Sequence, residues 1–142
     1  MKKWLLLAML FASCLIFVSC GQDAGKSDNT EMTIGESTQF SEEEMDAAIH
    51  AVKSKFKSFT NCELLRLSYD EVSSASMAKG YVEESRSSAE ENVIVFYSDF
   101  YVSPEGRVDG GLQPDHTYHN WAWILKRDSK NDSWKVDNWG LG

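Results

Sequence analysis

The first 39 residues limit most strongly what this chain of 142 residues can fold into. Two lysines near the start are followed by an apolar run that reaches Val18, and a stretch of mostly small and polar residues then extends to Gln39. A basic start, a short apolar run and small residues after it are typical of a secretory signal peptide. A polar segment with few apolar groups is typical of a flexible linker. We therefore expect three parts: a signal peptide over 1–19, a flexible tether over 20–39 and a single folded domain over 40–142.

The apolar run ends at Ser19-Cys20-Gly21. This segment resembles the lipobox of bacterial lipoproteins, whose cysteine receives a diacylglyceryl group through a thioether before the signal is cleaved. The resemblance implies that Cys20 is lipidated and that the protein is anchored to the bacterial cell membrane, facing outside the cytoplasm. Cys14 is a second candidate acceptor. An uncleaved anchor and an ordinary signal that ends in a structural cysteine are the alternatives, although about 15 apolar residues are fewer than the ~20 that span a bilayer.

The net charge bears on whether the chain binds nucleic acid, and the cysteine count bears on whether it has a reactive thiol. The formal net charge is −8, and without the expected leader the chain has 12 basic and 22 acidic side chains. Nucleic-acid binding depends on Lys and Arg that neutralise phosphates, so we expect no nucleic-acid partner. Once Cys20 is lipidated, Cys62 is the only thiol left and has no intramolecular partner. We expect Cys62 to be a small buried residue, because no adjacent base is evident that could activate it.

The clearest secondary-structure signal is the start of a helix at Ser41. Ser41 and Glu44 have the spacing of a capping box, and Phe40 and Met45 have the spacing of a hydrophobic staple. Apolar residues then recur at helical spacing, so that one face of the helix packs on other apolar groups. The pattern predicts a helix over residues 41–59.

The rest of the chain predicts strands and one further helix. Segments rich in Val, Ile and aromatic residues predict strands over 62–69, 92–102, 116–127 and 133–139, whereas 73–88 has helical spacing. The last three strands are joined by connections too short for crossover helices, which favours antiparallel pairing. We therefore expect an α+β domain with a curved antiparallel sheet of about four strands, packed on the N-terminal helix, and with both helices on one face.

The last two predicted strands carry a family resemblance. Trp121 to Arg127, a turn, and Trp134 to Gly140 resemble the closing hairpin of nuclear-transport-factor-like, cystatin-like domains. Together with the segments Phe40–Glu44 and Leu67–Glu71, this tail resembles an uncharacterised family of small bacterial lipoproteins. The resemblance implies a cystatin-like fold over most of residues 40–142. The resemblance does not supply an activity, because that family has none assigned, and we expect no cofactor.

Asp99 and its neighbours are the most enzyme-like cluster. Tyr97, Asp99 and Tyr101 share one face of a predicted strand because side chains alternate along it. The resemblance implies that an Asp or His base of an isomerase or dehydratase would lie in the cone between sheet and helix. Such a base needs burial that raises its pKa. The alternative is an Asp at the edge of the sheet, solvated or bonded to a backbone amide, and we therefore expect a pKa that is not appreciably raised.

Two aromatic and two imidazole side chains complete the candidate sites. Trp121 and Trp123 lie two residues apart, so both rings face one side of a strand, either as a ligand-binding platform or as part of the core. His116 and His119 are weak catalytic candidates, and their spacing of three places them on opposite faces of a strand. The sequence contains no Cys-x-x-Cys or His-Glu-x-x-His motif, so we expect no metal site.

The sequence supports two main functional hypotheses. The first is a lipid-anchored extracytoplasmic domain that binds an envelope partner or a small molecule without catalysis. The alternative is a small enzyme of the same fold with its base between sheet and helix. A third is a structural or inhibitor-like protein whose loop over 103–115 forms the contact surface, because loops of that length are often functional.

Overall fold

The computed structural model describes residues 23–86, 88–106 and 111–142. Its elements are β1 (Glu31–Ile34), α1 (Glu42–Phe56), β2 (Cys62–Tyr69), α2 (Glu71–Ser85), the short 3-10 helix η1 (Glu90–Asn92), β3 (Val93–Val102), β4 (His116–Lys126) and β5 (Lys135–Leu141). The α+β class is thus confirmed. The predicted signal peptide and the lipidation at Cys20 lie outside the described residues and stay predictions.

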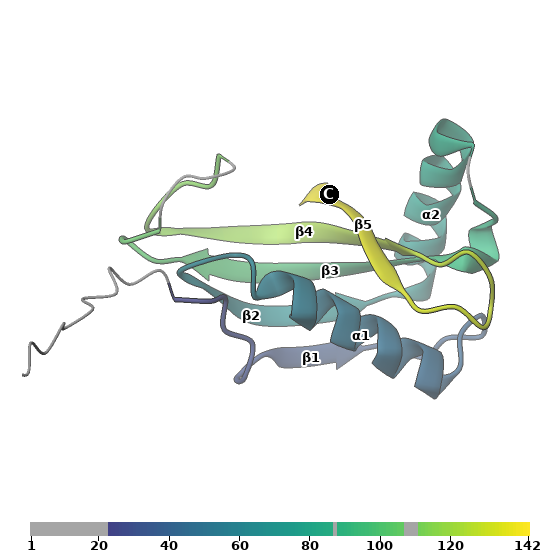
Figure 1. Cartoon of the computed structure of the whole chain (residues 1–142), viewed down its shortest axis with the longest axis horizontal. Coiled ribbons are helices and arrows are strands. Elements are labelled where there is room, and N and C mark those ends of the chain that lie inside the picture. Colours follow the sequence, from purple (N-terminus) through teal and green to yellow (C-terminus); the bar gives the residue numbers. More distant parts are fainter. Residues whose placement is uncertain (1–22, 87, 107–110) are drawn as a thin grey trace, which may run out of the picture.

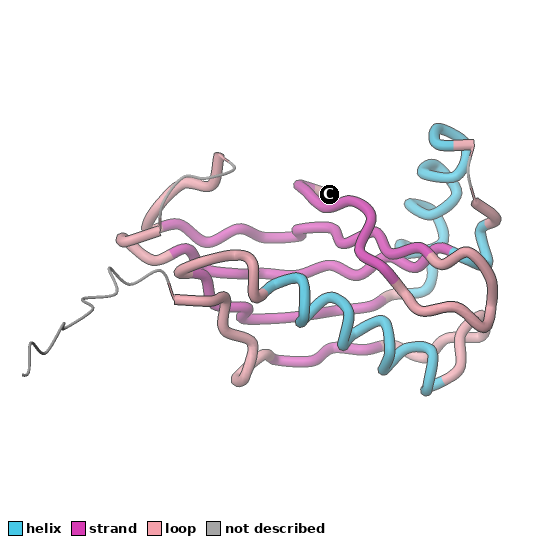
Figure 2. The backbone as a smooth tube through the Cα atoms, in the orientation of Figure 1, coloured by secondary structure: helices cyan, strands magenta, loops and turns pink. Residues whose placement is uncertain are grey.

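The five strands form one mixed sheet in the order β1-β2-β3-β4-β5 (Figure 1). β1 pairs with β2 in parallel, and the other neighbours are antiparallel. Figure 2 shows the strands as one layer, with α1 crossing it on one side and α2 at one end. The expectation of about four antiparallel strands is therefore corrected to five strands, one of them parallel.

The additional strand lies in the segment that the sequence analysis assigned to a flexible tether, and that assignment is wrong for residues 23–39. The Lys26 amide donates to the Cys62 carbonyl at 2.9 Å, and the Leu64 amide donates to the Lys26 carbonyl at 2.8 Å. A Cβ atom at Gly25 would overlap the Phe56 carbonyl oxygen. This glycine therefore serves a close backbone approach rather than flexibility, and backbone hydrogen bonds along β2 hold a segment that contributes little apolar surface.

Helix α1 begins as the sequence predicts and ends earlier. The Glu44 amide donates to Ser41 Oγ at 3.2 Å, and the Ser41 amide donates to Glu44 Oε2 at 2.8 Å, which completes the capping box. The helix ends at Phe56 instead of residue 59. Its buried residues are Met45, Ala48, Val52 and Phe56.

The main core lies between α1 and the face of the sheet that α1 covers. Phe56 and Trp123 have no exposed surface, and neither do Phe96 and Phe100 on β3. The Phe56 ring meets Phe100 and Trp123 edge to face, with ring centroids 5.7 and 6.2 Å apart. Aromatic side chains therefore fill the space between sheet and helix.

Helix α2 packs on the opposite face of the sheet, so the expectation of both helices on one face is wrong. Ala78 of α2 joins Val93 and Val95 in a second core cluster, and the Val95 amide donates to Ser74 Oγ at 2.9 Å. The N-cap of α2 is Asp70, directly after β2. This short connection directs α2 to the outer face, and β3 is consequently buried on both sides over Val93–Phe96.

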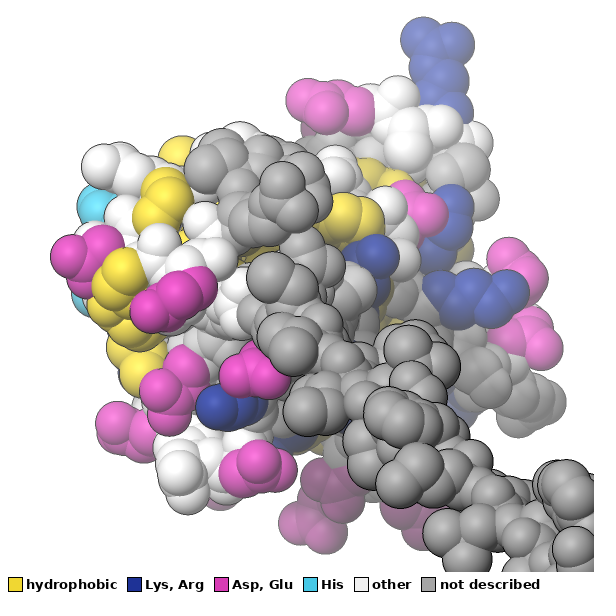
Figure 3. Space-filling view, turned by 60° about the vertical axis from the view of Figure 1, so that its left-hand side comes forward, with side chains coloured by type: hydrophobic (Ala, Val, Ile, Leu, Met, Phe, Trp, Pro, Cys, Tyr) yellow, Lys and Arg dark blue, Asp and Glu magenta, His cyan; other side chains and the backbone are white. Residues whose placement is uncertain are grey.

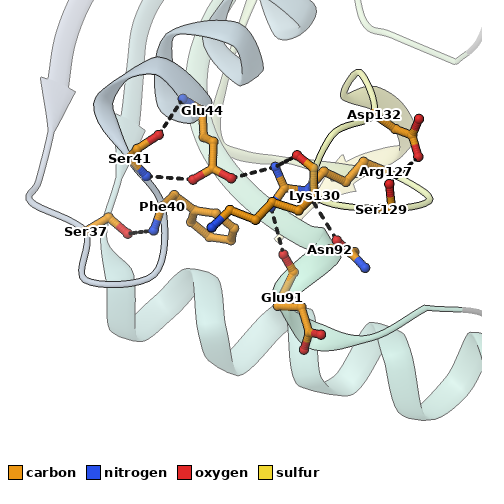
Figure 4. A network of polar contacts seen from close by, with 10 residues as sticks. All are labelled: Ser37, Phe40, Ser41, Glu44, Glu91, Asn92, Arg127, Ser129, Lys130 and Asp132. Carbon is orange, nitrogen blue, oxygen red and sulfur yellow. Dashed lines mark hydrogen bonds and ion pairs between the residues drawn. The ribbon is translucent and has the colours of Figure 1, made fainter.

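A buried arginine, Arg127, directly follows β4 and joins this end of the sheet to the first turn of α1 (Figure 4). The side chain of Arg127 is 5% exposed, and its Nη1 donates to Glu44 Oε1 at 2.8 Å. The guanidinium carbon lies 4.3 Å from the centroid of the Trp134 ring, a cation–π arrangement. The remaining donors reach Asn92 Oδ1 and the carbonyls of Glu91 and Lys130.

The core and the cap of α1 differ in their contribution to stability. Phe56→Ala should lower the free energy of unfolding by about 3–5 kcal/mol, because it leaves a cavity in the core. Ser41→Ala should lower it by about 1 kcal/mol, because it removes the cap. Ser54→Ala, on the exposed side of the same helix, is the control and should have almost no effect. Chemical denaturation of the chain without its leader measures all three, and the reverse order would show that the buried face is misassigned.

Glu44 makes stability depend on pH. The hydrogen bond from the Ser41 amide, and then the one from Arg127, lower the pKa of Glu44 below its ordinary value. The folded state therefore gains stability above the ordinary pKa of Glu and loses it as the pH falls through the lower folded pKa. Glu44→Gln should reduce the fall in unfolding free energy between about pH 5 and pH 3, whereas Glu43→Gln, one residue away and exposed, should leave that fall nearly unchanged.

Candidate functional site

Asp99 lies in a polar cluster on the outer face of the sheet, opposite α1. The flanking residues Ser98 and Phe100 are fully buried on the inner side, whereas the Asp99 side chain is 16% exposed. Asp99 Oδ2 accepts from Arg66 Nε at 3.1 Å, and Oδ1 accepts from the Asn120 amide at 3.1 Å. His119 Nδ1 lies 3.4 Å from Oδ2. The structure thus does not place Asp99 in the cone between sheet and helix.

Strand register and a bulge bring this cluster together. Arg66 of β2 is the direct partner of Asp99 in the β2–β3 ladder. In the β3–β4 ladder the register shifts between Ser98 and Phe100, and Asn120 has a positive φ of 53°. Asn tolerates this left-handed conformation better than most residues. The bulge turns the Asn120 amide toward the Asp99 carboxylate, so the expected bond to a backbone amide is present. The expected position at the edge of the sheet is wrong, because Asp99 lies on β3, the central strand of the sheet.

The surroundings of Asp99 favour its charged form. Partial burial by itself would raise the pKa of Asp99, but hydrogen bonds from Arg66, the Asn120 amide and His119, together with the Arg66 charge, lower the pKa below its ordinary value. A general base near neutral pH requires a pKa shifted in the other direction. The direction agrees with the prediction that the pKa of Asp99 is not raised.

Tyr97 and Tyr101 flank Asp99 on the same face but have different surroundings. Tyr101 Oη donates to Asp115 Oδ1 at 2.6 Å, and this hydrogen bond raises the pKa of Tyr101. Tyr97 packs with the second core cluster beneath α2, and burial raises its pKa. Tyr101 is therefore engaged by Asp115, and Tyr97 by the second core cluster, rather than by Asp99.

Trp121 and Trp123 face the inner side together, since both rings contact Phe59. Trp123 is fully buried, and its Nε1 donates to Ser98 Oγ at 2.8 Å. Trp121 is partly exposed and packs edge to face on Phe100 with centroids 5.3 Å apart. Its Nε1 is the one buried side-chain polar atom without a partner among the described residues. The pair contributes to the core rather than to an open platform.

His116 and His119 lie on opposite faces, as predicted. The His116 ring packs against Tyr118 on the inner side, with centroids 4.9 Å apart, whereas His119 is directed to Asp99 on the outer side. In the part of the chain that the structure describes, no group of three or more His, Cys, Asp or Glu residues could hold a metal ion.

Cys62 is a buried thiol at the start of β2. Burial raises its pKa to about 11, so at neutral pH the side chain is protonated and unreactive. The interpretation of Cys62 as a small buried residue is confirmed.

The described surface carries mixed charge. Figure 3 shows both acidic side chains and lysine or arginine side chains on this side of the domain. Among the described residues, no helix is long and apolar enough to cross a membrane.

No family model matches the chain, and searches of curated proteins and of solved structures found no significant match.

The Asp99 cluster predicts a measurable titration. In NMR titration of side-chain carboxyls, the pKa of Asp99 should lie below the unperturbed ~3.9, and Arg66→Met should raise it because the largest lowering contact is lost. Arg86→Met, at the end of α2, removes the same charge away from Asp99 and should leave its pKa unchanged. Equal effects of both variants would mean that net charge, not the Arg66 hydrogen bond, sets the pKa.

Proposed function

We propose that this chain is a lipid-anchored extracytoplasmic domain that binds a partner or a small ligand without catalysing a reaction. The observation that carries the proposal is the state of Asp99, which is paired with Arg66 and directed away from α1. Its lowered pKa suits a structural carboxylate rather than a poised base. A measured pKa of Asp99 above about 6 would overturn the non-catalytic proposal, because such a shift requires strong desolvation in a cleft.

The enzyme alternative loses Asp99, its main candidate base, because this residue is paired with Arg66 and directed away from α1. On the inner side of β3, Phe96 and Phe100 are fully buried, and the polar Ser98 accepts a hydrogen bond from the Trp123 indole. Among the described residues of this strand, none offers a carboxylate or an imidazole to the space between sheet and α1. The cystatin-like fold stays part of the proposal, supported by a sheet with α1 across one of its faces.

The packed N-terminal segment changes the geometry of the proposed anchor. Cys20 precedes Asp23 by three residues, which span at most about 11 Å at 3.8 Å per residue. The Asp23 amide donates to Asn61 Oδ1 at 3.1 Å, and the Asn61 amide donates to the Asp23 carbonyl at 2.7 Å. A lipid on Cys20 would therefore hold the Asp23 end of the domain close to the membrane surface, in place of the longer stand-off of a flexible tether.

The anchor can be tested at Cys20 with Cys14 as the matched control. Cys20→Ser should abolish acylation, prevent cleavage of the leader and leave a precursor without its acyl groups, whereas Cys14→Ser should leave processing unchanged. Mass spectrometry of the mature N-terminal peptide from the membrane fraction measures both. An unmodified Cys20 in mature wild-type protein, or acyl groups on Cys14 instead, would contradict the proposed anchor.

A further inference from the structure

A groove runs between strand β1 and helix α1, on the side of the domain where the sheet ends. Its volume is about 820 Å³, and its apolar lining includes Met32 and Ile34 of β1 and Met45 and Ile49 of α1. Met32 is 39% exposed, although it is a large apolar side chain. Figure 1 shows β1 at the edge of the sheet below α1. The groove thus has an apolar floor that is open to solvent.

The outer edge of β1 has no partner strand among the described residues, because β1 is the last strand in the sheet order. The Gly35 amide donates to the Tyr69 carbonyl of β2 at 3.0 Å. Backbone groups alternate between the two edges of a strand, so the amide and carbonyl groups of Met32 and Ile34 are directed to the free edge. Unpaired groups of this kind are a template for another strand.

The rim of the groove is acidic. Glu36, Glu42 and Asp46 line it, and the basic residues of α1 are in its last turn, beyond Ile49. A strand that enters the groove therefore meets negative charge around an apolar floor. Complementary charge across an interface increases both specificity and association rate.

We propose that this groove binds an extended basic segment of another protein, which adds to the free edge of β1 as a sixth strand. The inference rests on the proposed binding function and specifies the class of partner. Backbone hydrogen bonds to Met32 and Ile34 hold the segment, its apolar side chains at alternate positions enter the groove, and its Lys or Arg side chains meet the acidic rim. Strand addition beside a helix is an established mode of peptide recognition.

Charge and distance argue against two other occupants. A second copy of this chain would bring the same acidic rim against Glu36, Glu42 and Asp46, and like charges placed opposite each other are destabilising. The chain's own N-terminus is short after cleavage at Cys20, and it joins the domain at Asp23, next to Asn61. β1 runs parallel to β2 away from that end, and β2 spans about 23 Å from Cys62 to Tyr69 at ~3.3 Å per residue. The few residues between Cys20 and Asp23 therefore start at the opposite end of the sheet edge and do not reach the groove.

The test uses the full-length mature protein in detergent micelles and a labelled peptide, Lys-Ile-Lys-Val-Lys-Ile-Lys, as the probe. Fluorescence anisotropy measures its affinity, and amide hydrogen exchange at Met32 and Ile34 reports on the site. We expect saturable binding with slower exchange at both amides. A scrambled peptide with its four lysines together has the same charge without the alternation and should bind about tenfold more weakly, a difference of 1.4 kcal/mol.

Two sets of variants separate the groove from general electrostatics. Combined Glu36→Gln, Glu42→Gln and Asp46→Asn should weaken probe binding about tenfold, whereas Glu83→Gln, Glu84→Gln and Glu90→Gln, which neutralise three exposed acids elsewhere, should not. Met32→Pro removes an amide that the fold does not use and should weaken binding about as much. Met32→Ala keeps that amide and should weaken it less.

Several outcomes would overturn the inference. They are absence of binding at millimolar peptide, equal binding of the scrambled peptide, equal loss in both sets of neutralised variants, and a dimer that Met32→Pro dissociates. The last outcome would assign the groove to a second copy. The titration of Asp99 and the lipidation of Cys20 do not depend on β1, so failure here would leave the proposed function standing.

Discussion

The burial of Arg127 is the constraint on which most of this structure depends. Its guanidinium, 5% exposed, contacts Glu44 at the start of α1, the carbonyl of Glu91 in η1 and the ring of Trp134 before β5. A buried charge that loses its partner costs about 3–5 kcal/mol, so these segments have to assemble together. The ion pair thereby sets the N-terminal end of α1 against the β4–β5 connection and lays the helix across one face of the sheet.

The position of α1 decides which surfaces are left for a partner. Phe56 and Trp123 fill the space between α1 and the sheet, and α2 covers one end of the outer face. Two of the accessible features are the polar cluster at Asp99 and the groove beside β1. Asp99 is already satisfied by its hydrogen bonds, whereas β1 has unpaired backbone groups beside apolar side chains. The outer edge of β1 is thus a surface where an added strand gains both hydrogen bonds and apolar contacts.

Local signals in the sequence predicted local structure well. The Ser41–Glu44 capping box and the strand face shared by Tyr97, Asp99 and Tyr101 depend on spacing within a few residues, and the structure bears them out. The burial of Cys62, which was expected because no adjacent base is evident, is also borne out. The tether was misassigned because its composition is that of a linker, and hydrogen bonds to β2 are made by the backbone, which composition does not report. The prediction that α2 packs on the same face of the sheet as α1 was also wrong.

The sequence by itself determined the α+β class, the start of α1 and the net negative charge, because these depend on composition and short-range periodicity. Only the tertiary structure decided that Arg66 and the Asn120 amide hold the Asp99 carboxylate, since this contact depends on strand register and on a bulge in β4. It also decided that β1 is an edge strand beside α1. Arg66 lies 33 residues before Asp99, and Asn120 lies 21 residues after it. Which of these side chains and amides meet depends on the register of the strands in the whole sheet, where a slip of one residue moves every side chain to the other face.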